Sequence, residues 1–350
     1  MSTKRWIRGL TALVVISAAG IGMRSSVLAY NTHSTARALT HVTLVLKWVP
    51  QAQFAGYYVA LNKGFYRQQG LDVTIQPGGP NIVPEQVVAG GQAQFGIDWL
   101  SGLLVARDHG LNIQNIAQIY QASGMRMITF KSSGINSIAK FKGHKVGVWP
   151  SGNQYQFYAL MNKLHMSPPQ KYMTVVTEGF VMDPFLNHQL DVSQAMTYNE
   201  LGVVLEHGVK MSQLNVFDYN KLGVSILEDG IFSTPSWLQS HRAIAVKFLR
   251  ASIQGWKWAD SHQTQAGTIT YNYTPAGTRS QGTLHHQIYM AHQVAKLIQA
   301  GPGLSHPIGY MDPMLYQRTW SILLAQKQIK HAPSSTSYDQ SYWAAATKGM

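Results

Sequence analysis

The sequence predicts an α/β protein with two lobes, each built on a mixed, mostly parallel sheet, and a central ligand cleft between them. Its 350 residues are more than one compact core accommodates, and 45% apolar against 12% charged residues is a well-packed globular composition. Short strand-like segments alternate with helix-like segments, which is typical of parallel sheets covered by helices on both faces. The alternation restarts near Gly134 and returns to its first pattern after Asn220.

The first alternating unit begins with a strand at residues 42–46, where apolar and polar residues alternate. A helix follows and ends at Gly64, because glycine suits the position just after a helix end. A later helix begins near Pro84, since proline is favoured at the first helical position. The expected strands of this unit are 42–46, 73–76 and 94–97, and its expected helices are 54–62, one starting near 84, and 101–109.

The second unit follows a polar turn at residues 140–145 and is interrupted by Pro168-Pro169. Its expected strands are 146–149, 173–176 and 192–198, its expected helices are 153–164 and 184–188, and amphipathic helices follow at 244–258, 284–298 and 315–329. We therefore assign residues 41–133 and 221–350 to lobe 1 and residues 134–220 to lobe 2. Two crossovers between the lobes would let them hinge about a cleft.

The amino terminus has the layout of a secretory signal peptide. A basic leader precedes an apolar stretch at residues 10–23, and Val27 and Ala29 supply small residues before a cleavage site. The stretch is short for a membrane span, which needs roughly 20 residues. We expect a signal peptide over residues 1–29, with an uncleaved anchor as the alternative, and a linker over residues 30–40. The protein is then exported to the periplasm or the outer face of the cytoplasmic membrane.

Composition excludes several kinds of site. The chain has no Cys, which excludes disulfides, thiolate metal sites, a Cys nucleophile and a lipid-modified cysteine. The formal charge is +13, but the cations are scattered, so we interpret them as a solvated basic surface rather than a nucleic-acid site. The 14 His residues, His285 and His286 included, lack metal-ligand spacing and are expected to be solvated or to cap helices. We predict no metal, no cofactor and no nucleic-acid partner.

Candidate ligand-binding residues lie on loops at the carboxyl ends of strands, where parallel sheets of α/β proteins bind ligands. In the first unit these loops are 47–53, 77–81 and 98–101. Aromatic side chains offer a stacking surface for a flat heterocycle, and amide or carboxyl groups fix its ring nitrogens and exocyclic groups. The aromatic candidates are Trp48, Trp99, Trp149 and Tyr198, and the polar candidates are Gln51, Gln53, Asp98, Ser151, Gly152, Asn153, Asn199 and Glu200.

Structural alternatives exist for these candidates. For the aromatic rings the alternative is core packing, for Asn153 it is a cap on the following helix, and for Glu200 it is a surface ion pair. Ser151-Gly152-Asn153 also opens a helix whose free amide groups suit an anion. This segment lacks the lysine and glycine spacing of a nucleotide-hydrolysing P-loop, and the sequence contains no nucleophile-elbow motif.

The segment Leu46–Ala60 resembles a subgroup of ABC-importer solute-binding proteins related to thiamine pyrimidine precursor binding proteins and thiamine pyrimidine synthase. Further matching residues are 63–66, 70–73, 87–90, 95–96, 141–148, Asp191, Asn199 and Glu200. The resemblance implies a type II periplasmic-binding-protein fold, a permease partner and a ligand gripped between lobes. That ligand is a formylaminopyrimidine or hydroxymethylpyrimidine, a flavin or, more distantly, an alkanesulfonate. Gln51 and Gln53 before Phe54 are closer to the flavin-type members.

The synthase branch of this family uses a Lys and a His after the third strand and a cysteine-rich cluster later in the chain. The corresponding positions here are Asp98 and Gly102, and the chain has no Cys. We therefore predict a monomeric binding protein that is not an enzyme, with a small aromatic heterocycle and an ABC permease as partners. Membrane contact is expected only through the leader or the permease. The alternatives are a pyrimidine synthase-like enzyme and a secreted sensor domain that presents its ligand to a membrane receptor.

Overall fold

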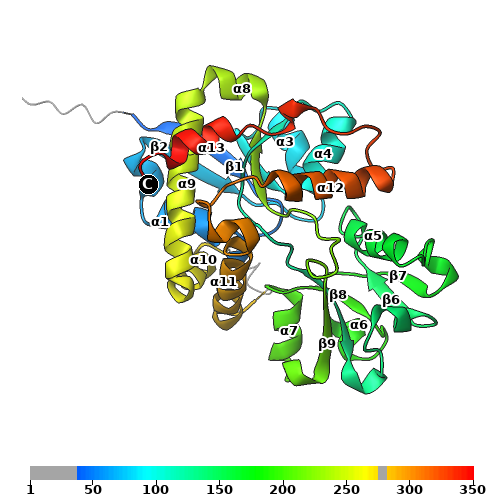
Figure 1. The fold of residues 1–350 in the computed structure, drawn as a ribbon. Coiled ribbons are helices and arrows are strands. Elements are labelled where there is room, and N and C mark those ends of the chain that lie inside the picture. The colour runs from blue at the N-terminus through cyan, green and yellow to red at the C-terminus, as the bar shows by residue number, and fades with distance from the viewer. Residues whose placement is uncertain (1–37, 275–281) are drawn as a thin grey trace, which may run out of the picture. The chain divides into compact units, whose positions relative to one another are not determined.

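The computed structural model describes residues 38–274 and 282–350 (Figure 1). The signal peptide predicted over residues 1–29 and residues 30–37 of the predicted linker lie outside the described residues. Strand β1 (Thr40–Val45) begins inside the predicted linker, because Thr40 already pairs with Leu71 of β2 (Leu71–Gln76).

A five-stranded sheet has the strand order β2-β1-β3-β10-β4. β1 runs parallel to β2 and to β3 (Phe95–Asp98), whereas β10 (Gly230–Ser233) runs antiparallel to both β3 and β4 (Gln114–Gln118). The chain re-enters this sheet at the carboxyl end of β3, where Gly230 is paired with Asp98. Because β10 is antiparallel to both of its neighbours, β4 runs in the same direction as β1, β2 and β3, and the sheet is mixed with four of its five strands parallel in direction, as predicted.

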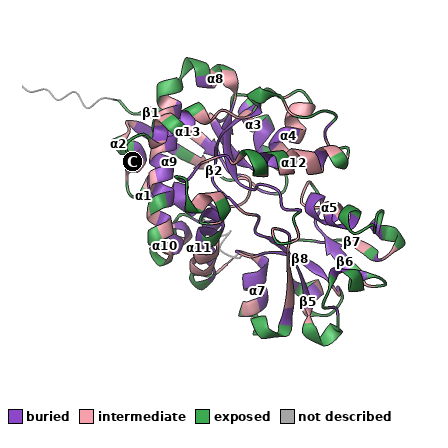
Figure 2. Ribbon diagram, in the orientation of Figure 1, coloured by how far each residue is buried: buried purple, intermediate pink, exposed green. Residues whose placement is uncertain are grey.

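Helices cover both faces of this sheet. Successive side chains of β1 point to opposite faces, so the hydrophobic cluster that each of them joins shows which helices pack on that face. Val42 and Leu44 belong to one hydrophobic cluster and Val45 belongs to another. The first cluster includes residues of α1 (Ala55–Asn62), α2 (Phe65–Gln68), α8 (Pro235–Ser240), α9 (Arg242–Ser261), α10 (Gln263–Tyr273), α11 (Leu284–Ile298) and α13 (Gln340–Thr347), and the second includes residues of α3 (Pro84–Ala89), α4 (Leu100–Asp108) and α12 (Pro313–Ala325). Buried residues concentrate on the strands and on the helix sides that face them (Figure 2). We call this sheet with its helices the large part.

The other strands form two smaller sheets. β5 (Met125–Phe130) lies between β8 (Ser193–Met196) and β9 (Leu214–Asp218) and runs antiparallel to both. β6 (Lys145–Val148) and β7 (Thr174–Thr177) pair in parallel, and a bridge from Val146 to Val192 links them to the segment before β8. With α5 (Tyr155–Lys163), α6 (Asp183–Leu186) and α7 (Glu200–Glu206), these strands are called the small part (Figure 1).

Strand β5 falls within residues 41–133, which the sequence assigned to lobe 1, yet it pairs with strands of the small part. The chain therefore leaves the five-stranded sheet between Gln118 and Met125. This exit segment contains Gln121 and Ser123 but is itself largely buried, so it does not read as a surface linker. Residues Ala38–Met350 form a single compact unit, so the division into two lobes stays a proposal.

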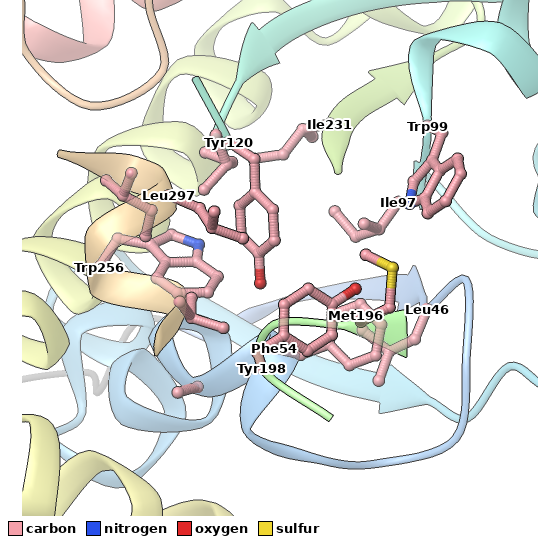
Figure 3. Packing of buried hydrophobic residues seen from close by; sticks show 14 of the residues in the cluster. Leu46, Phe54, Ile97, Trp99, Tyr120, Met196, Tyr198, Ile231, Trp256 and Leu297 are labelled. Carbon is pink, nitrogen blue, oxygen red and sulfur yellow. The ribbon is translucent and has the colours of Figure 1, made fainter. Parts of the chain in front are cut away.

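The two parts share one hydrophobic cluster. Met196 and Tyr198 of the small part belong to the same cluster as Leu46, Phe54 and Tyr120 (Figure 3). Two segments cross between the parts, at residues 119–124 and 219–229, and hydrogen bonds join them. Ser123 N–H donates to Asn220 Oδ1 over 3.0 Å, and Asn220 Nδ2 donates to the Ser123 carbonyl over 2.8 Å.

Candidate functional site

A cleft of about 830 Å³ lies where the large and small parts meet. All twelve sequence-predicted residues line it: Trp48, Gln51, Gln53, Asp98, Trp99, Trp149, Ser151, Gly152, Asn153, Tyr198, Asn199 and Glu200. Their roles as ligand contacts remain predictions. Lys47, Glu85 and Phe180 also line the cleft, and the sequence pattern did not single them out.

Three aromatic rings bring the two parts together at the cleft. Phe180, in the segment between β7 and α6, packs against Trp48 with ring centroids 4.7 Å apart and an interplanar angle of 60°. The same ring lies 6.0 Å from Trp149, whose Nε1 donates to the Gly179 carbonyl over 2.8 Å. Phe180 is 45% exposed, so part of this ring remains free to contact a ligand.

Trp99 and Tyr198 are both core residues and cleft residues, so core packing and a place at the cleft are not exclusive for these rings. Trp99 is 4% exposed and Tyr198 is 2% exposed, and both belong to the shared hydrophobic cluster (Figure 3). Tyr198 packs edge-to-face on Tyr120 with centroids 6.1 Å apart. Trp99 Nε1 is buried and has no hydrogen-bond partner among the described residues. Trp99 therefore holds an unpaired donor within the wall of the cleft.

A chain of side-chain hydrogen bonds fixes the amides of the loop after β1. Gln51 Nε2 donates to Gln53 Oε1 over 2.8 Å, and Gln53 Nε2 donates to Asp229 Oδ2 over 2.9 Å. Burial raises the pKa of Asp229 to about 7. With its nitrogen used in this way, Gln51 leaves Oε1 buried and without a partner among the described residues. This oxygen is an acceptor fixed in place at the cleft.

One end of the cleft holds a cluster of charged groups. Lys47 Nζ forms an ion pair with Asp98 Oδ1 and lies 4.9 Å from the centroid of the Trp99 ring. Burial acts to lower the pKa of Lys47, but the charge and hydrogen bond of Asp98, together with the charges of other nearby acids, outweigh it and the pKa is raised. Burial also opposes ionisation of Asp98, but the charge of Lys47 and the hydrogen bonds to Asp98 together hold its pKa below the ordinary value. Burial and the charge of Asp98 raise the pKa of Glu85 well above its ordinary value, which favours the protonated form.

Gly102 in α4 adjoins the same two carboxyl groups. A Cβ at this position would collide with Asp98 Oδ2 and would stand 2.9 Å from Glu85 Oε1. Any side chain here would displace the carboxyl pair. The resemblance to the synthase branch would place a His at this position. The packing of Gly102 against Asp98 leaves no room for a His side chain here.

The turn Ser151-Gly152-Asn153 precedes α5. Ser151 and Gly152 have φ angles of 61° and 95°, which is the left-handed region. Gly152 N–H donates to Gln154 Oε1 over 2.8 Å, so one amide that an anion would need is already used. Asn153 does not cap α5, contrary to the structural alternative for this residue, because its Nδ2 donates back to the Pro150 carbonyl over 2.8 Å.

Glu200 makes no surface ion pair, contrary to its own structural alternative, because it is 5% exposed at the start of α7. Met196 N–H donates to its Oε2 over 3.0 Å, and Asn199 Nδ2 donates to its Oε1 over 2.8 Å. Burial raises the pKa of Glu200 to about 7 in spite of these bonds. This carboxyl group is therefore close to balance between its charged and neutral forms at neutral pH.

His286 corrects the expectation that the histidines are solvated or capping. Its ring is fully buried, Nε2 lies 2.9 Å from Asn199 Oδ1, and Nδ1 lies 3.1 Å from Glu206 Oε1. It thus links α11 of the large part to α7 of the small part. Over residues 38–274 and 282–350, no three His, Cys, Asp or Glu residues are grouped as a metal site would need, and no helix is long and apolar enough to cross a membrane.

Comparison with known proteins shows which family this chain resembles. Residues 51–266 match the model of the NMT1/THI5-like family. Riboflavin-binding protein RibY from Chloroflexus aurantiacus is 24% identical over 82% of this chain and 81% of its own length. A formylaminopyrimidine-binding protein from Halalkalibacterium halodurans is 24% identical over 67% of this chain and 71% of its own length. A 4-amino-5-hydroxymethyl-2-methylpyrimidine phosphate synthase from Saccharomyces cerevisiae is 26% identical over 36% of this chain and 38% of its own length.

Solved structures agree on the fold. The periplasmic aliphatic sulphonate binding protein SsuA from Escherichia coli matches 85% of this chain and 95% of its own with a TM-score of 0.61 and 12% identity. The periplasmic nitrate-binding protein NrtA from Synechocystis PCC 6803 matches 89% of each chain with the same TM-score and identity. This likeness establishes the type II periplasmic-binding-protein fold that the resemblance implied. Because the family model covers more than half of its residues, the chain belongs to the NMT1/THI5-like family.

Proposed function

We propose that this chain is an extracytoplasmic solute-binding protein of an ABC importer that captures a small, flat aromatic heterocycle. The observation that carries the proposal is the cleft, in which rings from both parts surround buried polar atoms that have no protein partner among the described residues. Stacking on such rings is worth about 1–3 kcal/mol per ring by analogy with nucleic-acid bases. A ligand that left Gln51 Oε1 and Trp99 Nε1 unpaired would lose affinity, which gives the site selectivity.

Within this class a flavin is the first choice and a thiamine pyrimidine precursor the second. The cleft volume of about 830 Å³ lies in the upper part of the range usual for ligand pockets. A single pyrimidine ring would leave much of that space to water, whereas a tricyclic ring system would fill more of it. The relative named for riboflavin also aligns over more of this chain than the relative named for formylaminopyrimidine.

Capture would occur by closure of two lobes about the crossing segments at residues 119–124 and 219–229. A ligand that contacts both lobes favours the closed form, whereas one with equal affinity for both forms shifts nothing. The mature protein would act in the periplasm or at the outer face of the cytoplasmic membrane and deliver its ligand to a permease. The chain would carry no enzymatic activity, because Asp98 and Gly102 occupy the positions where the synthase branch would have a Lys and a His.

Thermal unfolding tests this proposal directly. A ligand that binds only the folded state raises its stability by about 2.7 kcal/mol at 100 times the dissociation constant. We expect riboflavin or a formylaminopyrimidine to raise the Tm of the wild type, and the rise to shrink in Trp48→Ala. Trp258→Ala is the matched control, because Trp258 stacks on His262 outside the cleft. An unmoved Tm with flavins, aminopyrimidines and sulfonates would refute the ligand class, and pyrimidine formation by the protein would refute the non-enzymatic assignment.

A further inference from the structure

The ionisable groups of the cleft are strongly unbalanced toward acids. Among the described residues that line it, Lys47 is the single Lys or Arg, whereas Glu85, Asp98 and Glu200 are carboxylic acids. His109 also lines the cleft, but it is exposed to solvent. The side chains of Glu85, Asp98 and Glu200 are 2%, 8% and 5% exposed. The described lining residues therefore offer an entering anion one Lys and no Arg.

The one lysine is already neutralised by a neighbour. Lys47 Nζ is held by Asp98 Oδ1, and the same oxygen accepts the Trp99 backbone N–H over 2.7 Å. The Trp99 ring lies 4.9 Å from the ammonium on another side. A phosphate or sulfonate that reached Lys47 would have to compete with a carboxylate fixed by two donors. It would also be brought close to the Asp98 carboxylate, and like charges in a poorly solvated site repel strongly.

The unpartnered groups of the same cleft suit a neutral ligand instead. Gln51 Oε1 is an acceptor and Trp99 Nε1 is a donor, and both lie on residues that are at least 96% buried. A neutral heterocycle carries N–H donors and carbonyl or ring-nitrogen acceptors on one edge, so it can satisfy both groups without bringing a charge. An ionised phosphate or sulfonate group adds charge and acceptor oxygens but no donor, so the group itself cannot pair with Gln51 Oε1.

We infer that the cleft admits uncharged heterocycles and rejects their phosphorylated or sulfonated counterparts, with the Lys47–Asp98 pair as the element that sets this selectivity. The inference rests on the proposed function, because it concerns the ligand of that same site. It separates this chain from the sulphonate-binding and nitrate-binding proteins that share its fold, whose names identify anionic ligands. It also excludes the phosphate ester that the related synthases are named for.

Two matched ligand pairs test the inference by calorimetric titration: riboflavin against riboflavin 5′-phosphate, and 4-amino-5-hydroxymethyl-2-methylpyrimidine against its phosphate. The pyrimidine pair is the stricter one, because its phosphate is too close to the ring to remain in solvent. We expect the phosphate to weaken binding of the neutral partner by about tenfold or more, since like-charge contacts across an interface cost up to several kcal/mol. Equal or tighter binding of the phosphate would overturn the inference while leaving the proposed function intact. Failure of every neutral and phosphorylated ligand to bind would refute the proposed function and the inference with it.

A charge variant checks the assigned pair. Asp98→Asn leaves the Lys47 ammonium without its counter-charge, so the preference for the neutral member should fall by about fivefold or more. Asp72→Asn is the matched control, because it makes the same charge change at a 57% exposed side chain on β2 and should leave the preference unchanged. Equal preferences in all three proteins would remove Lys47–Asp98 from the mechanism. If Asp98→Asn does not fold, a rise in the Tm of the wild type with inorganic phosphate or methanesulfonate would overturn the inference, and no rise would support it.

Discussion

The ring centroids of Phe180 and Trp48 lie 4.7 Å apart, although the two residues follow strands of different sheets and are separated by 131 intervening residues. Trp48 follows β1 of the large part, and Phe180 follows β7 of the small part. This contact places an aromatic side chain of the small part directly on the loop that also carries Gln51 and Gln53. A ligand stacked on Trp48 would therefore be in reach of both parts, which is the requirement for capture by closure.

Phe180→Ala should weaken ligand binding and speed ligand release. An aromatic pair contributes about 0.5–1.5 kcal/mol beyond the area it buries, which corresponds to a roughly 2- to 13-fold loss of affinity. Stopped-flow fluorescence would measure the release rate. Val181→Ala is the control, because Val181 is the next residue, is 59% exposed and does not line the cleft. Equal release rates in both variants would remove Phe180 from the binding surface.

Gln51→Leu should reduce affinity for the neutral heterocycle while nearly conserving side-chain volume. A ligand donor left without its acceptor costs about 1–3 kcal/mol, so the dissociation constant should rise roughly 5- to 150-fold. The variant also leaves Gln53 Oε1 without its donor, and unfolding of the ligand-free protein measures that separate cost. Gln92→Leu at an exposed position is the control. Unchanged affinity in Gln51→Leu would mean that Oε1 does not contact the ligand.

Gly102→Ala should lower stability, although alanine is the better helix former by about 1 kcal/mol. The added Cβ collides with Asp98 Oδ2, so the carboxyl group must move away from Lys47 or the helix must shift. We expect a lower midpoint of urea unfolding together with weaker ligand binding. A stability gain of the size set by helix propensity would contradict the packing described for Asp98 and Glu85.

Stability should fall as the pH rises from about 5 to about 7.5. Burial raises the pKa of Glu228 to about 7, so the folded state holds a proton that the unfolded state has released, and this contribution is lost as the pH rises through 7. Glu178, Glu200 and Asp229 have pKa values raised to about 7 by burial and act in the same direction. Glu228→Gln should flatten the pH dependence of the free energy of unfolding, since the amide keeps an acceptor for Gly124 N–H without the charge. The same slope in both proteins would show that Glu228 does not titrate in this range.

The candidate site could be predicted largely because of where strands end. Trp48, Asp98 and Trp149 each follow a short apolar strand or end it, and the carboxyl ends of neighbouring parallel strands meet at one edge of a sheet. Tyr198 and Glu200 follow β8 in the same way, although β8 pairs antiparallel with β5. All of these residues line the cleft. Strand and helix alternation was thus sufficient to gather them without knowledge of the fold.

Other features of the site and of the fold are not marked by any local pattern in the sequence. Phe180 lies in an irregular segment, so no periodicity distinguishes it from an exposed loop residue. The pairing of Lys47 with Asp98 joins residues 51 positions apart, and only the β1–β3 pairing brings them together. β5 and β10 were missed because both are buried on both faces, which removes the alternation that identifies a strand. The antiparallel entry of β10 between β3 and β4 is the feature that makes the large sheet mixed.

Native mass spectrometry of the mature protein, purified without denaturation and then offered riboflavin, a formylaminopyrimidine and an alkanesulfonate in turn, tests the central claim most directly. We predict a 1:1 complex with an uncharged aromatic heterocycle, either copurified or formed on addition, which Trp48→Ala weakens and Trp258→Ala does not. A protein that stays free of all heterocycles, or that retains only an anionic or aliphatic molecule, would contradict the assignment of this cleft.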